Sequence, residues 1–395
     1  MTNVDDVVRA LITRRGPVGF DVVVEAALYD PAGGFYVTGG RAGRAGDFIT
    51  SPEVGPLFGA LVARALDAWW AEAGEPAVFT VVEAGAGPGT LAHAVLQAGP
   101  SCAPALRYLL VEPSEAQRGM QAARLSLEDP AAVLVPLQDP EDPRSPRVGP
   151  GGPTVVSLAE LPRLPPPCVV LANELLDNLP FRLAERREGA WLEVMVGVEG
   201  PDLVEVLVPL SSREASLLER LAPSASDGAR APIVDKAAAW VRSARELAGP
   251  DGRVVAIDYA CDATDELASR PAAEWLRTYR RHDRGGEPLR FLGAQDITVE
   301  IPIDQLGEEP TSSMRQAAWL QRLGLDELVA EGRRRWRERA GLGDLEAVRA
   351  RSRISEATAL TDPAGLGAFR VLEWAPSSGR AAGAPGSGSG PIASG

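Results

Sequence analysis

Three glycines stand at alternate positions directly after an apolar run, in the stretch VVEAGAGPGT (81–90). They are Gly85, Gly87 and Gly89. Glycines at such a turn let a ligand approach the backbone closely, because no side chain occupies the space. A dinucleotide fingerprint would place its third glycine at Thr90, and a phosphate-binding P-loop would need a lysine, yet Lys236 is the only lysine in the chain. The turn therefore favours a nucleoside ligand that carries no phosphate.

Two acidic residues stand where neighbouring strands are expected to end. Glu83 lies two residues before the first glycine, and Glu112 follows the apolar run RYLLV (107–111). A carboxylate at the end of the second strand can accept hydrogen bonds from both ribose hydroxyls, and Glu83 can accept them from a cationic amino group. S-adenosylmethionine offers both groups and has no phosphate, so we expect it as the cofactor. The alternative is a glycine turn in an α/β sheet that binds no ligand.

The turn belongs to an alternating pattern of strands and helices. Strands expected at 78–84 and 107–114 are each followed by an expected helix, which is typical of an α/β fold with a doubly wound, mostly parallel sheet. Further strands are expected at 168–172, 252–260 and 367–375. The third strand of the sheet stays open between AVLV (132–135) and TVVSL (154–158), because the whole of 129–168 is crowded with proline and glycine.

Other segments are expected to surround this sheet. Ser51 is expected to cap a helix that has Pro52 at its first position and runs down to Gly74. An antiparallel stretch follows residue 180, and helices are expected over roughly 313–350. These segments suggest an N-terminal helical segment packed on the core, an α/β domain with an inserted α+β region, and a disordered tail. The predicted ranges are 1–75 for the helical segment, 76–375 for the domain with insertions at about 181–232 and 270–350, and 376–395 for the tail.

Composition excludes several classes of protein. The net charge of −14 argues against sequence-independent binding to nucleic acid, which needs a basic surface. Three widely spaced cysteines and two histidines offer neither a disulfide framework nor a metal site. The longest apolar runs are too short to cross a bilayer. The N-terminal stretch has early acidic residues and no long apolar run, so we expect no targeting presequence and a cytoplasmic location.

Several stretches together resemble one known family. ALYDPAGGFY, GDFITSPEVGPLFG, VVEAGAGPGTL, VLANELLDNLPFRL, VVAIDYA and LRTYRRH occur in this order. They resemble the MidA-like class I methyltransferases, and the resemblance covers about residues 5–375. Mitochondrial members of that family assist the assembly of respiratory complex I by dimethylating an arginine in one of its subunits. The resemblance implies a Rossmann-like class I fold, S-adenosylmethionine as cofactor, and methylation of arginine in a protein substrate.

The resemblance also implies a set of site residues. The segment GDFITSPE (46–53) abuts the cofactor site in that family, which adds Asp47, Thr50 and Ser51 to the glycine turn. Asn173 is expected at the same site. Glu174 and Asp177 follow the expected strand at 168–172 and are the predicted catalytic pair, because carboxylates can hold a guanidinium and collect its proton. The alternative is that Asn173 caps a helix whose first turn favours both acids.

Some nearby residues have weaker or different expectations. Glu53 is expected to be a first-turn acid, with a place in the pocket beside Asp47 as the alternative. Asp258 is expected to end a strand near the pocket or brace a loop, and His93 to be structural. The family's usual Phe-Phe pair is replaced by Leu175-Leu176, and a histidine usual near 300 is missing. These departures leave two alternatives open: a methyltransferase for a small molecule, and a non-catalytic assembly factor that keeps the fold.

Overall fold

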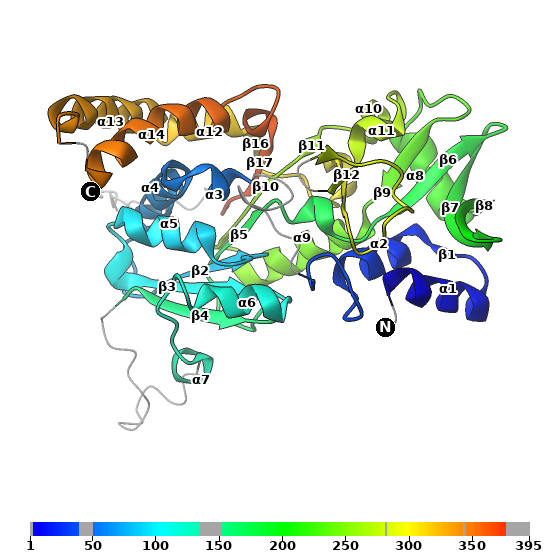
Figure 1. Cartoon of the computed structure of the whole chain (residues 1–395), viewed down its shortest axis with the longest axis horizontal. Helices are drawn as coiled ribbons and strands as arrows, with labels where there is room; N and C mark the ends of the chain where they lie inside the picture. The colour runs from blue at the N-terminus through cyan, green and yellow to red at the C-terminus, as the bar shows by residue number, and fades with distance from the viewer. Residues whose placement is uncertain (1–2, 39–49, 135–151, 281–282, 343, 377–395) are drawn as a thin grey trace, which may run out of the picture.

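The computed structural model describes residues 3–38, 50–134, 152–280, 283–342 and 344–376. In this part of the chain the main sheet has seven strands, in the order β16-β17-β10-β5-β2-β3-β4 (Figure 1). In that order the strands are β16 (Ser312–Arg315), β17 (Arg370–Trp374), β10 (Arg253–Asp258), β5 (Val169–Asn173), β2 (Phe79–Ala84), β3 (Leu106–Val111) and β4 (Thr154–Leu158). The five strands from β10 to β4 run parallel, and β17 runs antiparallel to both of its neighbours, β10 and β16. The expectation of an α/β fold with a mostly parallel sheet is confirmed.

The third strand is the one that the sequence left open. TVVSL forms β4, whereas the candidate AVLV overlaps the short helix α7 (Pro130–Val133). Asp129 caps that helix by accepting a hydrogen bond from the backbone N–H of Ala131, and Pro130 stands at its first position. A capping acid followed by proline is a helix start, and it outweighs the apolar character of the four residues.

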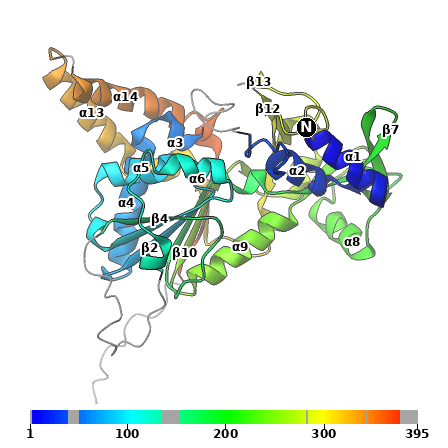
Figure 2. The same ribbon diagram turned by 60° about the horizontal axis from the view of Figure 1, so that its bottom comes forward.

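Helices cover both faces of the sheet (Figure 2). Neighbouring strand residues point to opposite faces, so that Val81 and Val82 belong to separate core clusters. The face of Val81 is covered by helices α4, α5, α12 and α13, and the face of Val82 by α9. The helices around the sheet are α3 (Ser51–Val54), α4 (Pro56–Glu72), α5 (Thr90–Ala98), α6 (Glu115–Gln121), α9 (Asp235–Ala248), α12 (Gln316–Arg322), α13 (Leu325–Arg339) and α14 (Leu345–Leu360).

A second layer of strands lies beside the main sheet, on the right in Figure 1. The antiparallel stretch expected after residue 180 forms its central strands. The sheet of this layer consists of β1 (Val18–Gly19), β6 (Arg182–Arg187), β7 (Ala190–Glu199), β8 (Asp202–Pro209) and β9 (Arg230–Ile233). A separate, smaller sheet consists of β12 (Leu276–Arg280), β13 (Asp283–Arg284) and β14 (Asp296–Val299). The short elements α8 (Ser212–Leu221), α10 (Thr264–Ala268), α11 (Ala272–Trp275), β11 (Ala260–Cys261) and β15 (Ile301–Pro302) complete this side.

The helices of residues 1–75 pack in two places. α1 (Val4–Arg15) and α2 (Phe20–Tyr29) contact the second layer, where β1 pairs with β7, whereas α4 packs on the main sheet through α5. The division of the chain into domains stays a prediction. No described helix is both long and apolar enough to span a bilayer.

Two expected helices have different bounds. The helix expected from Ser51 to Gly74 is two helices, because the helix is interrupted at Gly55, before Pro56. The N-cap residue of the first is Thr50 and not Ser51. A residue before proline disfavours the helical conformation, and a Cβ on Gly55 would lie 2.4 Å from the carboxyl carbon of Glu356. Likewise, the region expected to be helical from 313 begins as strand β16, and its last helix continues to Leu360.

Candidate active site

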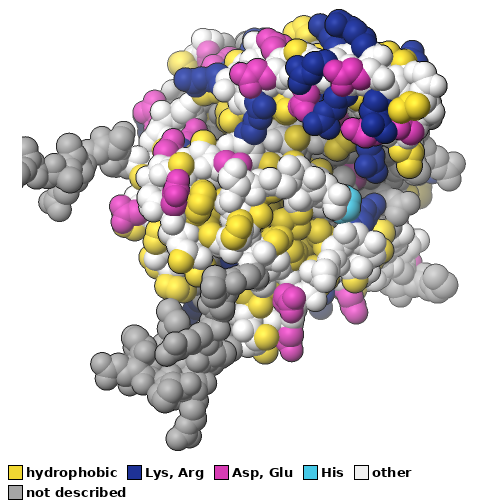
Figure 3. Space-filling view, turned by 90° about the vertical axis from the view of Figure 1, so that its left-hand side faces the viewer, with side chains coloured by type: hydrophobic (Ala, Val, Ile, Leu, Met, Phe, Trp, Pro, Cys, Tyr) yellow, Lys and Arg dark blue, Asp and Glu magenta, His cyan; other side chains and the backbone are white. Residues whose placement is uncertain are grey.

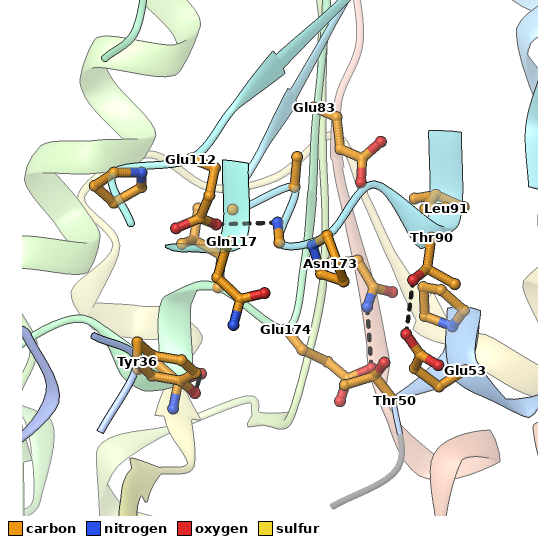
Figure 4. Close-up of a pocket in the computed structure, with 18 of the residues that line it drawn as sticks. Tyr36, Thr50, Glu53, Glu83, Thr90, Leu91, Glu112, Gln117, Asn173 and Glu174 are labelled. Carbon is orange, nitrogen blue, oxygen red and sulfur yellow. Dashed lines mark hydrogen bonds between the residues drawn. The ribbon is translucent and has the colours of Figure 1, made fainter. Parts of the chain in front are cut away.

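A cavity opens at the carboxyl ends of β2, β3 and β5 (Figure 4). Its walls come from the glycine turn, from α3 and from the chain after α2. Of the residues predicted for the site, those that line it are Thr50, Glu83, Gly85, Gly87, Glu112, Asn173 and Glu174. Ser51, Gly89 and Asp177 do not line it, and Asp47 lies outside the described residues. Open parallel sheets bind ligands at this edge, so the cavity lies where the strand pattern placed it.

The glycine turn has the backbone conformation that only glycine adopts easily. Gly85, Gly87 and Gly89 have φ angles of 68°, 51° and 77°. A Cβ on Gly87 would meet no atom of the described residues within 4 Å, because it would project into the open cavity. A Cβ on Gly89 would lie 2.8 Å from a methyl carbon of Leu125, so this glycine serves packing at the start of α5.

Glu83 is buried beneath the turn at the end of β2. Its Oε2 accepts a hydrogen bond of 2.6 Å from the hydroxyl of Tyr108. Burial raises the pKa of this carboxyl to about 8, and the bond from Tyr108 opposes that shift. Glu83 is therefore held in a fixed position where a cationic ligand group would favour its charged form.

Glu112 closes the cavity at the end of β3 and connects it to the glycine turn. Its Oε2 accepts a hydrogen bond of 3.0 Å from the backbone N–H of Gly87, and its Oε1 accepts one of 2.8 Å from that of Ser114. Burial raises its pKa, and these two backbone bonds lower it in part. Each carboxylate oxygen can accept a second bond, so Glu112 retains capacity for two ligand hydroxyls.

Asn173 and Glu174 form the opposite wall, at the end of β5. Glu174 has a φ of 54°, which is unusual for a residue other than glycine and turns its side chain toward the cavity. Its Oε1 accepts hydrogen bonds of 3.0 Å from the Ser51 backbone N–H and from Asn173 Nδ2. Among the described residues, no donor reaches Oε2. Burial raises the pKa of Glu174 to about 8.

Asn173 carries a polar atom that lacks a partner. Its Nδ2 donates to Glu174, but its buried Oδ1 accepts no hydrogen bond from any described residue. Buried acceptors are normally satisfied, so an unmet acceptor beside a cavity indicates a ligand donor. An amino group such as that of S-adenosylmethionine meets this requirement.

Asp177 does not line the cavity, and its carboxyl forms a hydrogen bond with that of Asp258. The carboxyl of Asp258 is fully buried and accepts backbone N–H bonds of 3.1 Å from Leu175, 2.7 Å from Leu176 and 2.9 Å from Tyr259. Burial and the neighbouring charge of Asp258 raise the pKa of Asp177 well above its usual range. Burial raises the pKa of Asp258 to about 6, because its backbone hydrogen bonds offset much of the cost. Asp258 thus braces the turn that carries Glu174, and Asp177 shares its environment.

Several pocket residues were not found from the sequence. Tyr29 and Tyr36 line the cavity with their rings stacked at 5.6 Å. The Tyr36 hydroxyl donates to Asn178 Oδ1 at 3.0 Å and lies 3.1 Å from Asp296 Oδ1. The family stretches contain both tyrosines and Asn178, but partners such as Tyr36 and Asp296, 260 positions apart, are joined only by the fold.

Glu53 is the first-turn acid of α3, as expected, and it also takes the alternative place on the cavity wall. Its Oε1 accepts a hydrogen bond of 2.7 Å from Thr90 Oγ1 at the start of α5. The bond ties α3 to the end of the glycine turn. Thr90, the residue that breaks the dinucleotide fingerprint, therefore has a structural use here.

Comparison with known proteins identifies the family. The model of the family described as "Putative S-adenosyl-L-methionine-dependent methyltransferase" matches residues 61–315. The chain belongs to this family. The resemblance seen in the sequence and the expected cofactor, S-adenosylmethionine, are confirmed, and the protein is an S-adenosylmethionine-dependent methyltransferase.

Two relatives of the methyltransferase carry names that concern arginine. The mitochondrial protein arginine methyltransferase NDUFAF7 of Rattus norvegicus is 26% identical over 335 residues, which cover 80% of this chain and 72% of that protein. The mitochondrial NDUFAF7 homolog of Drosophila melanogaster is 32% identical over 202 residues, 49% of this chain and 44% of that protein. The cytoplasmic location expected for the present methyltransferase stays a prediction.

A solved structure shares nearly the whole fold. It is a "likely methyl transferase from Burkholderia thailandensis bound to S-adenosyl-homocysteine", with a TM-score of 0.75 and 25% identity. The match covers 94% of the methyltransferase and 91% of that chain. Its bound ligand is the demethylated form of the cofactor that the glycine turn predicts.

Proposed function

We propose that this methyltransferase transfers a methyl group to an arginine side chain of a protein, and that Glu174 holds the guanidinium. The observation that carries the proposal is the position of Glu174. Its carboxylate lines the cavity next to Asn173, with Oε1 fixed by Ser51 and Asn173 and with Oε2 reached by no described donor. The names of the two relatives support arginine as the acceptor.

The cavity residues fit the cofactor. Bound there, S-adenosylmethionine supplies a methyl group on a positively charged sulfur. Glu112 has acceptor capacity for the ribose hydroxyls, Gly87 leaves space at the backbone, and Asn173 Oδ1 needs a donor. We infer that Glu83 offers its carboxylate to the amino group from beneath the turn. Thr50 completes the wall, and Ser51 acts indirectly through its bond to Glu174.

Glu174 has the chemistry that methylation of arginine requires. A free guanidinium keeps its proton, since its pKa lies above about 12. A carboxylate that accepts its N–H bonds orients one nitrogen and takes the proton as that nitrogen gains a methyl group. Burial raises the pKa of Glu174 to about 8, so its Oε2 has a higher proton affinity than an exposed carboxylate. Asp177 then acts as a positioning residue, through its hydrogen bond with Asp258, which holds the turn.

We also infer that the fold is the doubly wound class I arrangement with an inserted α+β region. The strand order β4-β3-β2-β5-β10-β17-β16 supports this inference, since the sequence-first strand lies in the middle and the chain winds outward in both directions. The reversed strand β17 near one edge supports it too.

Labelled methyl transfer into a protein extract tests the acceptor. Wild type is expected to form methylarginine, identified after hydrolysis, and Glu174→Gln should reduce the rate about a hundredfold while calorimetry shows nearly unchanged cofactor affinity. Label in methyllysine, or in small molecules alone, would contradict arginine as the acceptor. Unchanged turnover of Glu174→Gln would remove its catalytic role.

The pH dependence gives a second reading of the same residue. With the pKa of Glu174 raised to about 8, its basic form is scarce below that pH, so kcat/KM should rise with pH through this region. The glutamine variant lacks the group and should lose that rise. A profile of identical shape in both proteins would assign the titration to another residue.

A further inference from the structure

The helical hairpin of α13 and α14 carries an unusual concentration of positive charge. Residues 332–353 contain eight arginines and three acidic residues, although the chain as a whole has a net charge of −14. Figure 3 shows the side of the molecule that lies on the left in Figure 1, and Lys and Arg side chains gather at its top, where Figure 1 places α13 and α14. Such a local reversal of sign attracts groups that the rest of the surface repels.

Most of these arginines form no salt bridge with a residue that the structure describes. Arg335, Arg339 and Arg353 form ion pairs within the hairpin. The remaining five are exposed and form no ion pair with any described residue; they are Arg333, Arg334, Arg337, Arg349 and Arg351. Arginines that only stabilised the hairpin would be paired along and between its helices.

Large apolar side chains are exposed among these arginines. Leu342, Leu345 and Val348 are exposed by 68%, 75% and 57%. Isolated exposed leucines are ordinary, but three within seven residues, bordered by unpaired arginines, have the composition of a protein interface. We call these three residues and the five unpaired arginines the basic tip.

The other end of the hairpin is fixed beside the cavity. Glu356 of α14 is buried and accepts a hydrogen bond of 2.9 Å from the backbone N–H of Leu57, at the start of α4. Gln316 of α12 accepts one of 2.9 Å from the Ser51 hydroxyl and donates one of 3.2 Å to the carbonyl of Leu360. The base of the hairpin is therefore held near the cavity by hydrogen bonds, and the hairpin extends away from it (Figure 1).

We propose that the basic tip is a docking surface for an acidic segment of a protein partner that also presents apolar side chains. Arginine pairs with carboxylates through two parallel hydrogen bonds. The apolar residues add surface that is removed from water when the partner binds, which favours binding. Glu338, Asp344 and Glu346 stand among the apolar residues and oppose insertion into a lipid surface. A long polyanion such as nucleic acid would also meet the acidic remainder of the molecule.

Fluorescence anisotropy with two labelled peptides tests this docking. The probes are a repeat of Glu-Glu-Leu and a repeat of Lys-Lys-Leu, and no methyl transfer is involved, so the result does not depend on the proposed acceptor. Wild type should bind the acidic peptide alone, more weakly as salt increases. Replacing Arg333, Arg334 and Arg337 by Glu should weaken binding about tenfold or more, because attraction becomes repulsion.

A matched control separates local from overall charge. Arg213, Arg220 and Arg242 are also exposed but lie in α8 and α9, so replacing them by Glu changes the net charge equally and should preserve affinity. Leu345→Ser with Val348→Ser should weaken binding by a smaller factor and leaves every charge in place. The proposal would be overturned by an equal loss of affinity in the control or by the absence of binding in wild type. It would also be overturned if phosphatidylserine vesicles or duplex DNA, in place of the peptide, bound in a way that depends on the basic tip.

Discussion

Gly87→Val should abolish cofactor binding while leaving the protein folded. The φ of Gly87 is 51° and a Cβ there meets nothing within 4 Å, so the new side chain fits the protein and fills cavity space. Holding an L-residue in the left-handed conformation costs about 1–2 kcal/mol, and a branched residue lies at the upper end. The fold should withstand that cost, but the cofactor must give up its approach to the backbone.

The expected size of the effect follows from linkage. Ligand at 100 times its Kd stabilises a folded protein by about 2.7 kcal/mol. With an unfolding entropy of about 2.1 cal/mol/K per residue, this corresponds to a rise in Tm of about 3 °C for a chain of this length. Wild type should show that rise with S-adenosylmethionine, and Gly87→Val should show none, with affinity reduced at least about a hundredfold, or 2.7 kcal/mol.

Gly99→Val is the matched control. Gly99 ends α5 with a φ of 68°, and a Cβ there also meets nothing within 4 Å, but it does not line the cavity. Both variants should lose similar stability, and only Gly87→Val should lose binding, measured by calorimetry and by the thermal shift. Full affinity in Gly87→Val would refute the assignment of the cavity, and equal loss in both variants would refute a local effect.

Three further substitutions test other contacts. Glu83→Gln should flatten the pH dependence of stability. Burial raises the pKa of Glu83 to about 8 in the folded state from 4.5, so between these values the folded state retains a proton that the unfolded state releases. The free energy of unfolding of wild type therefore falls as pH rises through this range. Urea titrations from acidic to basic pH should show a smaller decline in the variant, and parallel curves would contradict the burial argument. Glu356→Ala should cost about 1–3 kcal/mol in chemical denaturation, because Leu57 N–H loses its acceptor, and Glu356→Gln should recover part of it; equal losses in both variants would argue against the hydrogen bond. Asp177→Asn should lower turnover by much less than Glu174→Gln, since Asp177 does not line the cavity; an equal loss would return it to the catalytic pair.

The local parts of the site were predictable from the sequence. A glycine turn after an apolar run, with acids ending two strands, needs only short-range patterns, and the structure brings Glu83, Gly87 and Glu112 to one cavity. The edge of the sheet followed from the same pattern, because parallel strands bring their carboxyl ends together.

The parts that depend on distant contacts were not predictable. Gly55 interrupts the expected helix because Glu356 approaches it from α14, about 300 positions away. Asp177 and Glu174 both follow β5 in the sequence, but only Glu174 lines the cavity. One local feature was also left open: Asp129 followed by Pro130 starts α7, although AVLV has the apolar character of a strand.

A crystal structure of the protein with S-adenosyl-homocysteine would show how the cofactor lies relative to Glu174. We expect the ribose hydroxyls on Glu112, the amino group beside Asn173 Oδ1 and Glu83, and the sulfur facing Glu174. A ligand bound elsewhere, or a sulfur directed away from Glu174, would contradict this arrangement.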